Sequence, residues 1–144
     1  MKLLFAFCAA AGLMMATNSA SAQSSPEDVA ARCANIINGI VERCQNAAGD
    51  ETAQCVRKIR QLLADGRERA ARRMAADCIR SATARTEKCV NRVERVCNAC
   101  IDTLQDMGAP QLARRINNIC EDAVAALRTT LQREKHAIRE ALAG

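Results

Sequence analysis

The chain of 144 residues carries a formal net charge of +5 at pH 7, and only 1% of its residues are aromatic. It has no tryptophan or tyrosine, and both phenylalanines, Phe5 and Phe7, lie close to the N-terminus. This composition excludes stacking platforms for single-stranded nucleic acid, aromatic cages for cations and the aromatic anchors that dominate most protein interfaces. We therefore expect no sequence-specific nucleic-acid partner.

Residues 1–22 have the features of a secretory signal peptide. Met1-Lys2 is a positively charged start, residues 3–16 are apolar, and Ala20-Ser21-Ala22 is a small-x-small cleavage site. Cleavage would leave residues 23–144 as a single cysteine-rich domain in a periplasm or outside the cell. The apolar run is too short to span a bilayer comfortably and no later run is longer, so we expect no transmembrane helix.

The first predicted helix covers residues 26–64. Ser25-Pro26-Glu27-Asp28 is a helix start with a serine N-cap, a proline in the first position and acids in the first turn. Gly49-Asp50 could break this helix, but the regular cysteine spacing across it favours a kink. Its apolar residues follow three- and four-residue steps and form the expected buried face: Val29, Cys33, Ile36, Ile37, Ile40, Val41, Cys44, Ala48, Cys55, Val56, Ile59, Leu62 and Leu63.

Two further helices are predicted over residues 67–107 and 110–142. Asp65-Gly66 separates the first helix from the second, and Gly108 and Pro110 separate the second from the third. The expected buried face of the second helix is Met74, Cys78, Ile79, Ala82, Cys89, Val90, Val93, Cys97, Cys100, Ile101 and Leu104. That of the third is Leu112, Ile116, Ile119, Cys120, Ala123, Val124, Leu127, Leu131, Ile138 and Leu142.

Eight cysteines remain beyond Cys8, and an even number in an exported chain favours disulfides. Six of them recur every eleven residues, close to three helical turns, so they form a nearly straight stripe on each of two helices. Three pairs are placed symmetrically about the Asp65-Gly66-Arg67 turn and a fourth about Gly108-Ala109-Pro110, as an antiparallel hairpin requires. The predicted disulfides are Cys33–Cys100, Cys44–Cys89, Cys55–Cys78 and Cys97–Cys120. The predicted fold is all-α: an elongated, disulfide-stapled antiparallel helical hairpin extended to a three-helix bundle.

Cys97 and Cys100 also form a Cys-x-x-Cys motif, which occurs in redox and metal-binding proteins. On a helix the two side chains point about 60° apart, so each can face a different neighbouring helix. This geometry favours two structural disulfides. The alternative is a thiol protein that binds copper or zinc, or acts in redox chemistry, through these two residues.

Positive charge is concentrated between residues 57 and 73, at the predicted turn of the first hairpin. We call this segment the basic tip. Its acidic residues are Asp65 and Glu68, and its seven basic residues are Arg57, Lys58, Arg60, Arg67, Arg69, Arg72 and Arg73. Such a cluster suits an anionic surface or an acidic protein. Arginines on a solvated helix face without a partner are the simpler interpretation, and the sequence identifies no partner.

No catalytic constellation is recognisable beyond residue 22. His136 is the one histidine and lies in the charged stretch Arg133-Glu134-Lys135-His136, while the serines are Ser24, Ser25 and Ser81. A triad or a histidine metal site cannot be built from these residues, so we expect no enzyme activity, cofactor or bound metal. The sequence predicts a small exported structural or binding protein, with a thiol protein or a cationic binder of anionic envelope surfaces as alternatives.

Overall fold

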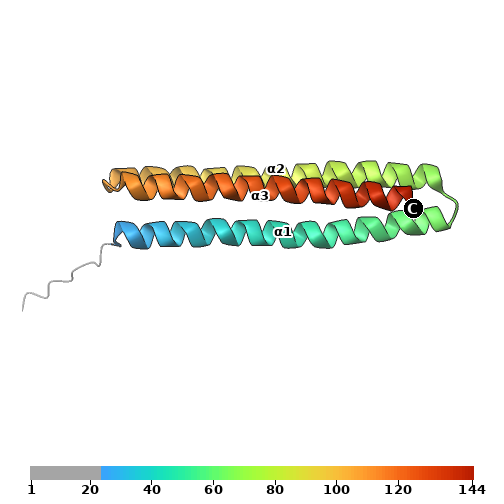
Figure 1. Cartoon of the computed structure of the whole chain (residues 1–144), viewed down its shortest axis with the longest axis horizontal. Helices are drawn as coiled ribbons and strands as arrows, with labels where there is room; N and C mark the ends of the chain where they lie inside the picture. The colour runs from blue at the N-terminus through green and yellow to red at the C-terminus, as the bar shows by residue number, and fades with distance from the viewer. Residues whose placement is uncertain (1–23) are drawn as a thin grey trace, which may run out of the picture.

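The structure is a computed structural model that describes residues 24–144, so the expected signal peptide lies outside the described residues. Three long helices, α1 (Pro26–Ala64), α2 (Glu68–Asp106) and α3 (Pro110–Ala143), lie side by side in an elongated bundle (Figure 1). The chain reverses direction twice, so α2 is antiparallel to both other helices, and each helix packs against the other two. The all-α, three-helix prediction is confirmed.

The start of α1 follows the local chemistry of its sequence. The Ser25 hydroxyl accepts a hydrogen bond from the backbone N–H of Asp28 at 3.1 Å, and the Asp28 carboxylate accepts one from the N–H of Ser25 at 3.2 Å. This reciprocal capping box satisfies two N–H groups that a helix start leaves without partners. The helix then continues through Gly49-Asp50 to Ala64, so these two residues do not interrupt it.

Both interhelical turns use the same backbone geometry. Gly66 and Gly108 each have a φ of 70°, in the left-handed region that glycine enters without steric cost. At the first turn the N–H groups of Gly66 and Arg67 donate to the carbonyls of Leu63 and Leu62, which is a Schellman motif. The N–H groups of Gly108 and Ala109 donate to Gln105 and Leu104 in the same way.

Four disulfides join the helices in the pairing expected from the cysteine positions. Three connect α1 to α2 and one connects α2 to α3: Cys33–Cys100, Cys44–Cys89, Cys55–Cys78 and Cys97–Cys120. The Cα atoms of the four pairs lie between 6.1 and 6.4 Å apart, within the roughly 4.4–6.8 Å that a disulfide spans. Small side chains permit this approach, because Ala30, Ala48, Ala75 and Ala82 are buried around the bridges.

The interior divides into two apolar clusters along the bundle. The larger one surrounds Ile37, Val93, Leu104 and Ile116, and the smaller one surrounds Ile59, Ala71 and Ile138 near the α1–α2 turn. The prediction was wrong for Ile36, which is 45% exposed, because it lies at the margin of the α1 stripe rather than at its centre. Within residues 24–144, no helix is apolar over a length that could cross a membrane.

Replacing glycine by alanine should have opposite effects on stability at the Gly66 turn and at Gly49 within α1. Gly66→Ala should lower the free energy of unfolding by about 1 kcal/mol, because a Cβ atom is disfavoured at positive φ although the surrounding space is open. Gly49→Ala, within α1 and with nothing near the new Cβ, should raise it by about 0.5–1 kcal/mol. Urea unfolding followed by circular dichroism, with disulfides intact, measures both. Stabilisation by Gly66→Ala would contradict the left-handed turn.

Candidate functional site

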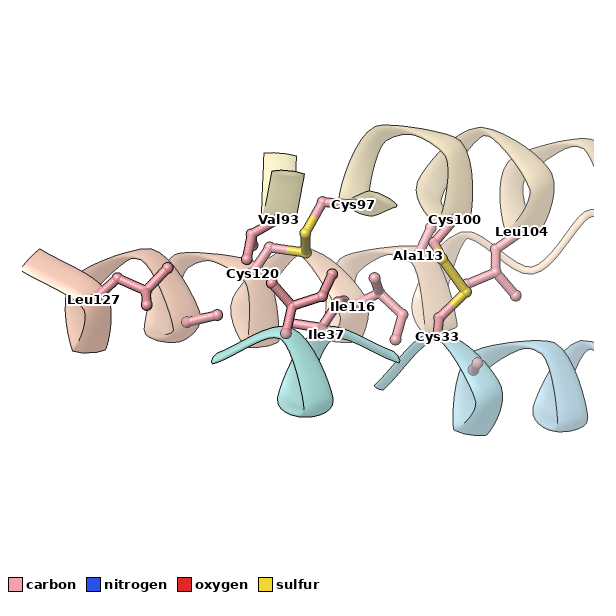
Figure 2. Close-up of a cluster of buried hydrophobic side chains, with 13 residues drawn as sticks. Cys33, Ile37, Val93, Cys97, Cys100, Leu104, Ala113, Ile116, Cys120 and Leu127 are labelled. Carbon is pink, nitrogen blue, oxygen red and sulfur yellow. A yellow bond between two sulfur atoms is a disulfide. The ribbon is translucent and has the colours of Figure 1, made fainter. Parts of the chain in front are cut away.

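The Cys-x-x-Cys motif is divided between two disulfides that point to different helices. Figure 2 shows Cys97 bonded to Cys120 of α3, and Cys100 bonded to Cys33 of α1. All four of these cysteines are buried, and the first bridge packs close to Val93 in the larger apolar cluster. Both sulfurs of the motif are therefore already bonded. Among residues 24–144, no group of three or more histidine, cysteine, aspartate or glutamate side chains is placed to hold a metal ion.

The side chains considered for catalysis lie apart on the surface of the bundle. His136 is exposed on α3, where its Nε2 lies 3.1 Å from the Glu140 carboxylate one turn along the helix. Ser25 caps α1, and Ser24 accepts a hydrogen bond from Arg32. Ser81 is exposed on α2. The structure does not bring the histidine and the serines together into one site.

The seven side chains of the basic tip are all exposed around one end of the bundle. They come from the last turns of α1 and the first turns of α2, on either side of Gly66. Their one ion pair among the described residues joins Arg72 to Glu68 at 3.9 Å, with both side chains more than 70% exposed. A pair this exposed offsets little of the local charge in energetic terms. The tip is thus a solvated concentration of positive charge.

Two shallow hollows lie at this end of the molecule. One, of about 470 Å³, is lined by Gly66, Arg67, Glu68, Arg69, Ala70 and Arg73, at the start of α2. The other, of about 360 Å³, is lined by Leu63, Glu68, Arg72 and Leu142, where α1 and α3 end. The N-cap residue of α2, Arg67, makes no side-chain capping hydrogen bond. The first hollow therefore combines three arginines with the positive end of a helix dipole.

A partly buried cluster of charged side chains, which the sequence analysis did not predict, links all three helices. Arg85 of α2 forms ion pairs with Glu51 of α1 and Glu134 of α3. The Thr52 hydroxyl donates to Glu134 Oε1 at 2.8 Å. Glu134 is only 5% exposed, and its Oε2 is buried without a hydrogen-bond partner among the described residues. This cluster lies between the two apolar clusters and between the Cys44–Cys89 and Cys55–Cys78 bridges.

The sequence does contain a signal for this cluster. Glu134 lies three residues after Leu131 and four before Ile138, so it occupies the apolar stripe of α3. Glu51 lies within α1 with its side chain half exposed, and it contacts Arg85. A charge on a buried stripe requires an opposite charge on a facing helix, and Arg85 supplies it.

No protein-family model matches the chain, and neither a curated protein nor a solved structure does.

The disulfide pairing predicts that oxidised protein cleaved after residue 22, and therefore without Cys8, has no thiol that reacts with an alkylating reagent after unfolding in denaturant without reductant. Peptide mapping by mass spectrometry should recover the four pairs seen in the structure. Cys97 and Cys100 should each be found with a different partner. Free thiols at these two positions, in protein from its native compartment, would contradict the pairing and favour the thiol alternative.

The charged cluster predicts strong coupling between Arg85 and Glu134. Arg85→Met should lower the free energy of unfolding by about 3 kcal/mol, because it leaves a buried carboxylate without its counter-charge. Adding Glu134→Leu to that variant should recover most of the loss, since no buried charge is then unpaired. Urea unfolding of the two single variants and the double variant measures the coupling. Additive losses would contradict a shared ion pair.

Proposed function

We propose that the protein is a small, exported, non-enzymatic binding protein that contacts an anionic partner through its basic tip. Four disulfides in one small domain are typical of proteins that work in an oxidising environment, a periplasm or the cell exterior. The observation that carries the proposal is the exposure of all seven basic side chains at one end. A concentrated positive field of this kind raises the association rate of anionic partners.

The shape of the bundle supports a role in which one end makes contact. Helices α1 and α2 have 39 residues each and span about 58 Å at a rise of about 1.5 Å per residue. The disulfides between them are distributed along this length, which restrains the hairpin against bending and separation. The tip is therefore presented at a fixed distance from the opposite end, where the chain enters α1.

The thiol alternative has no comparable support. Copper or zinc binding by Cys97 and Cys100 requires free thiolates, and in the structure each of these sulfurs is bonded to another cysteine. Redox activity would require a bridge that a partner thiol can reach, whereas Cys97 is 4% exposed and Cys100 is 8% exposed. We therefore favour the surface of the tip over the sulfur atoms.

Charge reversal tests the proposal. The triple variant Arg69→Glu, Arg72→Glu and Arg73→Glu should bind polyphosphate and anionic lipid vesicles at least about tenfold more weakly at low salt, because it inverts the field at the tip. A matched control, Arg92→Glu, Arg95→Glu and Arg114→Glu, makes the same change in net charge on exposed residues far from the tip.

The control should retain the affinity of the native protein for both probes, measured by sedimentation with vesicles and by titration with polyphosphate. Equal losses in the two triple variants would show that net charge alone matters. No binding of native protein to either probe would exclude the basic tip as an anion-binding surface.

A further inference from the structure

The basic tip is bordered by an apolar step that arises from the unequal ends of the helices. Helix α3 stops before the α1–α2 hairpin does, so the hairpin projects beyond the C-terminus (Figure 1). Leu63 near the end of α1 and Leu142 near the end of α3 line the hollow at this step, together with Glu68 and Arg72. Both leucines are only partly buried, although they pack against the smaller apolar cluster.

The arginine-lined hollow and the leucine-lined hollow are neighbours, because Glu68 lines both. A ligand that covers the tip therefore meets guanidinium groups and aliphatic side chains within one surface. Arginine forms paired hydrogen bonds with phosphate oxygens. The leucine side chains form no hydrogen bonds, so they can stabilise a complex only by leaving water.

This combination distinguishes between classes of anionic partner. A soluble polyanion such as polyphosphate presents charge alone and would use the arginines while leaving the leucines in water. An anionic lipid bilayer presents phosphate groups immediately above methylene chains, so it can satisfy both hollows together. The tip also carries two acidic residues, Asp65 and Glu68, but its seven basic residues leave it with a net positive charge that suits an anionic surface.

We infer that the partner of the basic tip is an anionic lipid surface, with Leu63 and Leu142 entering the boundary between head groups and acyl chains. This inference rests on the proposed function and adds the identity of the surface. The end of the bundle that carries the α1–α2 turn faces the membrane, because the arginines and both leucines lie at this end. The bundle then projects from the bilayer.

A tryptophan reporter tests the insertion directly, because residues 24–144 contain no native tryptophan, tyrosine or phenylalanine. On addition of phosphatidylglycerol vesicles to the variant Leu142→Trp, its fluorescence should shift to shorter wavelength and be quenched by lipids brominated on the acyl chain. The control is Met107→Trp, at an exposed apolar residue at the opposite end of the bundle. Its fluorescence should change in neither respect.

A second comparison uses polar replacements. The double variant Leu63→Gln and Leu142→Gln should bind phosphatidylglycerol vesicles about tenfold more weakly while its affinity for polyphosphate is unchanged, because only the lipid uses the leucines. Circular dichroism confirms that this variant retains its helices, and the two tryptophan variants provide the readout independently if it does not.

The outcomes separate this inference from the proposed function. Vesicle binding without any spectral shift in Leu142→Trp, or equal binding of vesicles by the native and double-glutamine proteins, would overturn insertion and leave a purely electrostatic tip. If the native protein bound neither vesicles nor polyphosphate, the proposed function itself would be excluded. A shift in Leu142→Trp that the arginine reversals abolish would support both.

Discussion

The close approach of α1 and α2, held by three disulfides, is the constraint on which the rest of the structure depends. A disulfide requires Cα atoms within about 4.4–6.8 Å, so the facing positions must carry small side chains or the bridges themselves. The eleven-residue spacing of the cysteines keeps the contact line nearly parallel to both helix axes. A regular hairpin results, and α3 has only to cover its remaining apolar face.

Covalent bridging also accounts for a core that, within residues 24–144, contains no aromatic residue. An aromatic side chain buries roughly 150–250 Å², and the interior here is built instead from alanine, valine, isoleucine and leucine with the buried sulfurs. Each disulfide contributes about 2–4 kcal/mol, chiefly by restricting the unfolded chain. That contribution allows the bundle to tolerate a buried ion pair, Arg85–Glu134, at the junction of its two apolar clusters.

The helices, their turns and the disulfide pairing could be predicted because each depends on positions within a simple repeat. Gly66 and Gly108 set the turns, and the symmetric cysteine positions then fix which residues face each other. The Arg85 cluster could not be derived in the same way, because its geometry depends on the rotation of three helices about their axes. The apolar step at Leu63 and Leu142 depends on where α3 ends relative to the hairpin, which required the assembled bundle.

The cysteine spacing has a consequence for oxidative folding. Eight cysteines allow 105 pairings, and an extended chain would let cysteines eleven residues apart, such as Cys33 and Cys44, react with each other. Once the segment is helical, eleven residues separate those two positions by about 16 Å, well beyond the reach of a disulfide. Helix formation thus blocks wrong bridges between cysteines eleven residues apart, and reversal of the chain at Gly66 brings the correct partners together.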